Sequence, residues 1–122
     1  MKFILLVHHD ETAFEKMSDE TKKGLLTESI GLCHQLDAKG EYVHASPVHP
    51  AATAAIVRVR EGKPIVTDGP FIEAKELMGG FAIFDVPTLE DAIAWGKRFR
   101  SIIGEGESEL VRIYGPSDYA GG

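Results

Sequence analysis

The chain has few of the features that cross-link small proteins or anchor them in a membrane. It contains a single cysteine among 122 residues, Cys33, so an internal disulfide is excluded and no second thiol completes a CxxC redox or zinc motif. The apolar run at the N-terminus ends at Val7 and is too short for a signal peptide or a membrane-spanning helix. We therefore expect a soluble, cytoplasmic protein without a membrane anchor.

Positive charge is also scarce. The chain has 13 Lys and Arg residues against 19 Asp and Glu residues, which gives a net charge of −6, and no Lys/Arg cluster is large enough to bind a phosphate backbone. Nucleic acid and anionic membranes are bound through such clusters, so we expect neither as a partner. The usual motifs of hydrolases and of nucleotide-binding and dinucleotide-binding proteins, namely GxSxG, the P-loop and GxGxxG, are absent as well.

The apolar content, by contrast, is sufficient for one compact domain. Hydrophobic residues make up 43% of the chain, whose length lies within the usual size of a single domain. No repeat, low-complexity tract or linker divides the sequence. We expect a single domain over residues 1–115, followed by a flexible tail at residues 116–122.

Two segments have the pattern of amphipathic helices. Ser18 can cap a helix over residues 19–38, with acidic residues in its first turn and Gly40 after its last turn. Thr88 can cap a second helix that extends to Ile103. In the first helix, the apolar residues that recur at helical spacing and are expected to face the core are Leu26, Ile30, Cys33 and Leu36.

The segments with the pattern of strands are residues 2–8, 42–48, 54–60, 65–67, 81–86 and 109–114. With the helices they predict an α+β fold: a ferredoxin-like β-α-β-β-α-β sandwich with an extra hairpin and both helices on one face of the sheet. Residues 2–8 and 81–86 are apolar on both faces, so a monomer would expose an apolar patch on the other face. We therefore expect a homodimer, in which a second subunit covers this patch.

An Asp-Gly-Pro-Phe motif at residues 68–71 lies within a longer ordered run. The run begins Val66-Thr67-Asp68-Gly69-Pro70-Phe71 and continues with Glu73, Lys75, Glu76, Gly79, Gly80, Ile83 and Asp85-Val86-Pro87. It resembles the signature of the DGPF-motif branch of the YCII-related family, and the similarity extends to the opening strand and to residues 57–60. The resemblance implies a ferredoxin-like fold and a dimer of the α+β-barrel type. It implies no particular activity, because most members are uncharacterised.

Asp68 is the first candidate for chemistry. Its carboxylate could act as a general base or orient a ligand in a cleft, although an Asp in such a turn commonly accepts hydrogen bonds from nearby backbone N–H groups instead. The loop that follows has the same two alternatives: Phe71, Glu73 and Lys75 could bind a substrate, or they could belong to a solvated charged loop. The sequence leaves both alternatives open.

Histidines at the ends of two strands form the second set of candidates. His8 and His9 end the first strand, and His49 follows the second. Because strand ends can converge at the rim of a sheet, these histidines and Asp68 could supply acid/base groups or ligands for a divalent metal. Their spacing matches no established metal motif, so we predict neither a metal nor another cofactor. The alternative is that they are exposed or half-buried residues without a catalytic role.

The first helix carries two further reactive side chains. In the wider YCII-related family, a histidine on the first helix and an aspartate after the second helix have been proposed as an acid/base pair. Here His34 lies late in its helix and residues 100–103 contain no aspartate, so the pair is not assigned. Cys33 lies on the apolar side of the same helix, and we expect it to be a buried, inert thiol.

Two functions remain open from the sequence. The first is a cofactor-free enzyme that performs acid/base chemistry, by proton transfer or elimination, on a small oxygenated or aromatic molecule. The second is a non-catalytic module that binds a metabolite or a regulatory protein partner. A carboxylate and an imidazole within hydrogen-bonding distance in an apolar environment would favour the enzyme.

Overall fold

The computed structural model describes residues 1–50, 53–68 and 77–119. Within these ranges the strands and long helices follow the predicted order, with two short helices in addition. The elements are β1 (Lys2–His9), α1 (Glu11–Glu15), α2 (Asp19–Ala38), β2 (Tyr42–Pro47), β3 (Ala55–Arg60), β4 (Lys63–Asp68), β5 (Leu77–Asp85), α3 (Leu89–Ile103), β6 (Ser108–Arg112) and α4 (Pro116–Tyr119). α4 occupies the start of the predicted tail.

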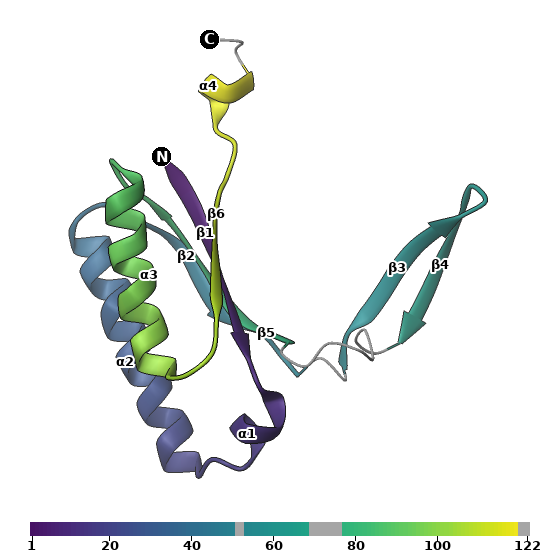
Figure 1. Cartoon of the computed structure of the whole chain (residues 1–122), viewed down its shortest axis with the longest axis horizontal. Helices are drawn as coiled ribbons and strands as arrows, with labels where there is room; N and C mark the ends of the chain where they lie inside the picture. Colours follow the sequence, from purple (N-terminus) through teal and green to yellow (C-terminus); the bar gives the residue numbers. More distant parts are fainter. Residues whose placement is uncertain (51–52, 69–76, 120–122) are drawn as a thin grey trace.

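The strands are arranged as an antiparallel sheet in the order β2-β5-β1-β6, together with a separate hairpin of β3 and β4. α2 and α3 lie side by side on one face of the sheet (Figure 1). This arrangement confirms the predicted ferredoxin-like α+β fold, with the hairpin inserted between β2 and β5. No helix in the described part of the chain is both long and apolar enough to cross a membrane.

Local capping interactions explain where the long helices begin and where α2 ends. The Ser18 hydroxyl accepts a hydrogen bond from the Thr21 N–H (3.1 Å), and the Thr88 hydroxyl accepts one from the Asp91 N–H (3.1 Å). Each bond satisfies an N–H group that the first turn of a helix leaves without an intrahelical partner. After α2, Gly40 adopts a φ of 71°, a conformation that favours glycine and stops the helix.

A short helix, α1, lies in a stretch for which the sequence predicts no regular structure. The Asp10 carboxylate caps it by accepting hydrogen bonds from the Thr12 N–H (2.9 Å) and the Ala13 N–H (3.3 Å). A helix of 5 residues is too short to show helical periodicity, so the capping residue is the one signal that could have indicated it.

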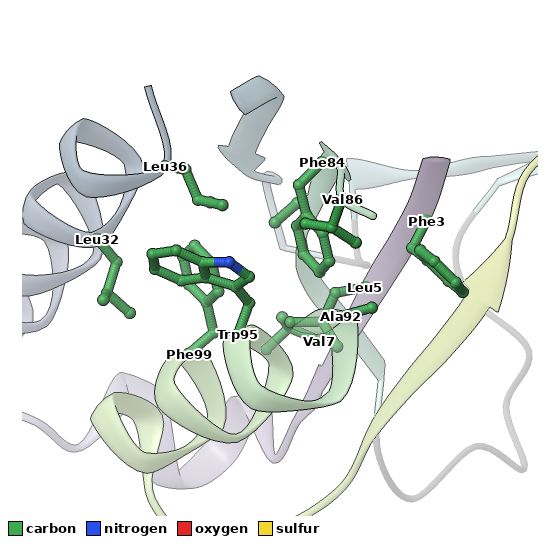
Figure 2. Close-up of a cluster of buried hydrophobic side chains, with 11 residues drawn as sticks. Phe3, Leu5, Val7, Leu32, Leu36, Phe84, Val86, Ala92, Trp95 and Phe99 are labelled. Atoms are coloured by element: carbon green, nitrogen blue, oxygen red, sulfur yellow. The ribbon is translucent and has the colours of Figure 1, made fainter. Parts of the chain in front are cut away.

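The hydrophobic core lies between the sheet and the two long helices (Figure 2). Its buried side chains come from the helix-facing side of the sheet and from the facing sides of α2 and α3: Phe3, Leu5, Val7, Leu32, Leu36, Ala82, Phe84, Val86, Ala92, Trp95 and Phe99. The indole N–H of Trp95 donates a hydrogen bond to the Glu41 carboxylate (3.3 Å). The large aromatic surface is therefore buried without leaving this donor unsatisfied.

The buried line of α2 differs from the predicted one. Leu36 is buried as expected, and Leu32, which flanks the predicted line, is buried as well. Leu26 and Ile30, by contrast, are 47% and 45% exposed, whereas Leu25 is half-buried. Compared with the prediction, the helix is therefore rotated about its axis, so that the line of Leu25, Leu32 and Leu36 faces the core. Two neighbouring lines of this helix are apolar, and periodicity alone does not decide between them.

The sheet face opposite the helices, termed the open face, is apolar at its centre. Because side chains alternate along a strand, residues paired in register point to the same side. On this basis the open face carries Ile4, Leu6, Phe81, Ile83 and Val111. Both long helices lie on the other side of the sheet (Figure 1), so no helix of the described residues covers this face. The predicted apolar second face is therefore present.

Candidate functional site

A histidine and a carboxylate meet at one end of the open face. Alternation along β1 places His8 on the same side as Ile4 and Leu6, and Glu109 of β6 is paired in register with Leu6. The His8 Nε2 and the Glu109 Oε1 lie 3.1 Å apart, within hydrogen-bonding distance. The His8 side chain is 26% exposed and that of Glu109 is 65% exposed. The pair thus stands at the boundary between the apolar face and solvent.

A second imidazole lies on the open face, on the edge strand β2. His44 of β2 is paired with Ile83, and its ring packs on Phe81 with 5.7 Å between the ring centroids. The apolar centre of the open face is therefore flanked by His8 at the end of the central strand β1 and by His44 on the edge strand β2. His44 was not among the predicted catalytic residues, because only the strand order shows that it shares a face with His8.

His9 lies on the other side of β1, away from the open face. Its ring stacks on Phe14 of α1, with 5.3 Å between the centroids and 24° between the planes. The adjacent β5 has a bulge at Gly79, where a Cβ atom would overlap the His9 ring. His9 is thus held by packing in this structure, and a catalytic role for it stays a prediction.

The other predicted residues do not join the pair of His8 and Glu109. His49 is exposed after β2, and Asp68 is the exposed last residue of β4. Among the described residues, no hydrogen bond or ion pair connects Asp68 to any of the predicted histidines. The predicted substrate-binding residues Phe71, Glu73 and Lys75 lie outside the described residues, as does the rest of the Asp-Gly-Pro-Phe motif. Their roles stay predictions.

No metal centre is visible in the part of the chain that the structure describes. Residues 1–50, 53–68 and 77–119 contain no group of three or more His, Cys, Asp or Glu side chains close enough to hold an ion. An imidazole beside a carboxylate, as at His8 and Glu109, is an arrangement that can perform acid/base chemistry.

Arg100 positions the chain around His8 and Glu109. Its guanidinium donates hydrogen bonds to the backbone carbonyls of His8 (2.7 Å), Glu107 (2.8 Å) and Glu105 (2.8 Å). These bonds join the last turn of α3 to the end of β1 and to the loop that leads into β6. Arg100 is thus a positioning residue for the site, which sequence reasoning missed because its partners are backbone atoms and carry no sequence signal.

A groove on the helix side of the sheet lies between α3 and the strands β1 and β6. Leu5, Ile93 and Leu110 form its apolar surface, and Lys97 and Ser101 contribute polar groups. None of the predicted catalytic residues lines it, and the Ser101 hydroxyl already donates to the Lys97 carbonyl (2.7 Å). The groove shares Arg100 with the surroundings of His8, but neither His8 nor Glu109 lines it.

Cys33 is a thiol whose burial can be tested chemically. Its side chain is half-buried, not fully buried as expected, and packs against the core. This partial burial raises the pKa of the thiol above its ordinary value of 9.0. Because less thiolate forms, a disulfide reagent such as dithionitrobenzoate should react with native Cys33 roughly tenfold or more slowly than with glutathione at mildly alkaline pH. Unfolding in guanidinium chloride should remove the difference in reaction rate between Cys33 and glutathione. A native rate equal to the unfolded rate would contradict the expected inert thiol.

Comparison with known proteins covers nearly the whole chain. A family model described as the YCII-related domain matches residues 1–114. An uncharacterized protein of Rhizobium meliloti (strain 1021) is 25% identical over 121 residues, which cover 97% of this chain and 98% of the relative. The chain therefore belongs to the YCII-related domain family.

Proposed function

We propose that this chain, as a member of the DGPF-motif branch, is a cytoplasmic homodimer that binds a small organic molecule beside the open face and performs cofactor-free acid/base chemistry on it. His8 is the acid/base group, and Glu109 is its orienting partner. The observation that carries the proposal is the distance of 3.1 Å between the His8 Nε2 and the Glu109 Oε1 at the end of an apolar face. Proton transfer or elimination on an oxygenated or aromatic molecule is the reaction class.

The chemistry follows from the two ring nitrogens. With Nε2–H donating to the Glu109 carboxylate, Nδ1 carries the lone pair and can accept a proton from a ligand. The carboxylate also stabilises the imidazolium that forms when the proton is taken up. In general acid/base catalysis the nitrogen that takes up a proton can return it in a later step.

The apolar face supports both the ligand and the dimer. Leu6 and Phe81 lie next to the pair and offer an apolar contact surface for an aromatic or aliphatic ligand. A second copy stacked on the open face would exclude water from its centre, which strengthens the electrostatic interaction between His8 and Glu109. Two-fold homodimers are the commonest oligomers, and a self-complementary apolar face suits this symmetry.

A non-catalytic function is the alternative, and the exposure of Glu109 favours it. With 65% of its side chain in contact with solvent, the carboxylate is screened by water in the single chain, which weakens its effect on the imidazole. A module that holds a metabolite or a protein partner at the same face would need no shielded acid/base pair. The two functions differ in whether a bound molecule exchanges protons.

The substitution His8→Gln tests the catalytic proposal. Small oxygenated aromatic acids and ketones that raise the melting temperature would be incubated with the protein in D₂O, and exchange of their C–H protons would be followed by NMR. We expect the wild type to catalyse exchange and His8→Gln to lower the rate by about 100-fold or more, since general acid/base groups typically contribute at least this factor. His34→Gln, at an exposed position of α2, is the matched control and should leave the rate unchanged.

Two results would contradict the proposal. If a compound binds but the wild type exchanges none of its protons, the binding module is favoured. If His8→Gln exchanges at the wild-type rate, another group performs the chemistry. Asp68→Asn, measured in the same assay, then shows whether the carboxylate predicted from the sequence is that group.

A further inference from the structure

The β3–β4 hairpin exposes an unusual amount of apolar surface. Register pairing places Val57 opposite Val66 and Val59 opposite Pro64, so these side chains point to the same side of the hairpin. Val57, Val59 and Val66 are 69%, 71% and 63% exposed. The arm face, as we term this side, consists of the apolar residues Ala55, Val57, Val59, Pro64 and Val66, with Asp68 at its end opposite Ala55.

The described body of the same chain does not support this hairpin. β3 and β4 pair with each other and not with the four-stranded sheet. Figure 1 shows the hairpin extending away from the body, on the side of the sheet opposite α2 and α3. A two-stranded hairpin is marginally stable in water on its own, and contiguous exposed apolar surface marks an interaction site. The arm face therefore needs a partner surface.

The charge of the hairpin indicates which partner fits. Residues 55–68 contain three basic residues and two acidic ones, a formal charge of +1, whereas the remaining chain contains ten basic and seventeen acidic residues, a formal charge of −7. The side of the hairpin opposite the arm face carries Arg58, Arg60 and Lys63. Because these basic side chains point away from the arm face, they form no ion pair within a contact made by it. The net positive charge of the hairpin instead favours its approach to the acidic body of a second copy at longer range.

We infer that the β3–β4 hairpin is an arm that packs its arm face on the second subunit of the homodimer. This inference rests on the homodimer in the proposed function. A second copy stacked on the open face would lie on the side of the sheet toward which the hairpin extends. Two-fold symmetry then gives each subunit one arm, and each arm packs on the other subunit.

The substitution Val66→Asp tests the arm, with Thr67→Asp as the matched control. Thr67 is the next residue of β4, is also exposed, and points to the opposite side of the hairpin. Sedimentation equilibrium should show the dimer dissociation constant raised about tenfold or more by Val66→Asp, because a carboxylate is then buried without a partner, and changed less than about threefold by Thr67→Asp. Val66→Thr, which keeps the branched shape, should give an intermediate value. Far-UV circular dichroism checks that each variant is folded.

A cross-linking experiment gives an independent readout. Glu61, in the turn of the hairpin, is replaced by Cys in a Cys33→Ser background and labelled with a benzophenone maleimide. Irradiation should produce a covalent dimer on a denaturing gel, and Val66→Asp should reduce its yield. If the wild type sediments as a monomer, the proposed homodimer fails and the arm fails with it. If the wild type is a dimer but Val66→Asp and Thr67→Asp have equal dissociation constants, the homodimer stands and the arm is overturned.

Discussion

Replacing Leu36 by alanine should lower the free energy of unfolding by about 2–5 kcal/mol, whereas the same change at Leu26 should lower it by less than about 1 kcal/mol. Both residues lie on α2, but Leu36 is 1% exposed and Leu26 is 47% exposed. At Leu36 the substitution removes buried apolar atoms and leaves a cavity between α2 and the sheet. At Leu26 it removes atoms that are already half in water.

The comparison is made by urea unfolding at one fixed protein concentration, because the stability of a dimer depends on concentration. Leucine and alanine have similar helix propensities, so the difference between the two variants reports burial. If Leu26→Ala costs as much as Leu36→Ala, the side of α2 that carries Leu26 is covered by another subunit or by residues beyond those described. That result would also mean that the apolar line of α2 expected from the sequence, which includes Leu26, is buried.

This pair of leucines illustrates how far the sequence predicts the fold. Helix bounds follow from local chemistry, and Ser18 and Thr88 cap α2 and α3 at the predicted positions. The rotation of α2 about its axis does not follow from local chemistry. Its two neighbouring apolar lines have the same periodicity, and packing against the sheet determines which of them is buried. Strand order was predictable from the sequence of elements, since few topologies suit a strand-helix-strand-strand-helix-strand pattern.

The candidate site was less accessible to sequence reasoning. His8 was predicted as a candidate, but its partner Glu109 is 101 positions away and is brought close by the register between β1 and β6. The register between two strands depends on how the faces of the whole sheet pack. The sequence alone therefore does not show which carboxylate lies beside His8. The expected convergence of Asp68 with the histidines relied on strand ends meeting at one rim. Asp68 instead ends a strand of the hairpin, which does not belong to the main sheet.

Introducing aspartate at Ile4 should have the largest effect on assembly. Ile4 lies on the central strand β1, between Ile83 of β5 and Val111 of β6 on the open face. In a dimer that stacks two open faces, the substitution buries two carboxylates in an apolar interface, one from each subunit. We expect the dimer dissociation constant to rise by about 1,000-fold or more, so that sedimentation velocity shows a monomer where the wild type shows a dimer.

The control for this prediction is Ile30→Asp, which makes the same substitution at an exposed position of α2 on the helix side of the sheet. It should leave the dimer intact, because no second subunit is expected there. Ile4→Thr keeps a β-branched side chain in the strand and should weaken the dimer less, which separates loss of the interface from loss of the fold. If Ile4→Asp remains folded and dimeric, the open face is not the dimer interface. The site at His8 would then stay open to solvent, and the exposure of Glu109 would favour a binding module over an enzyme.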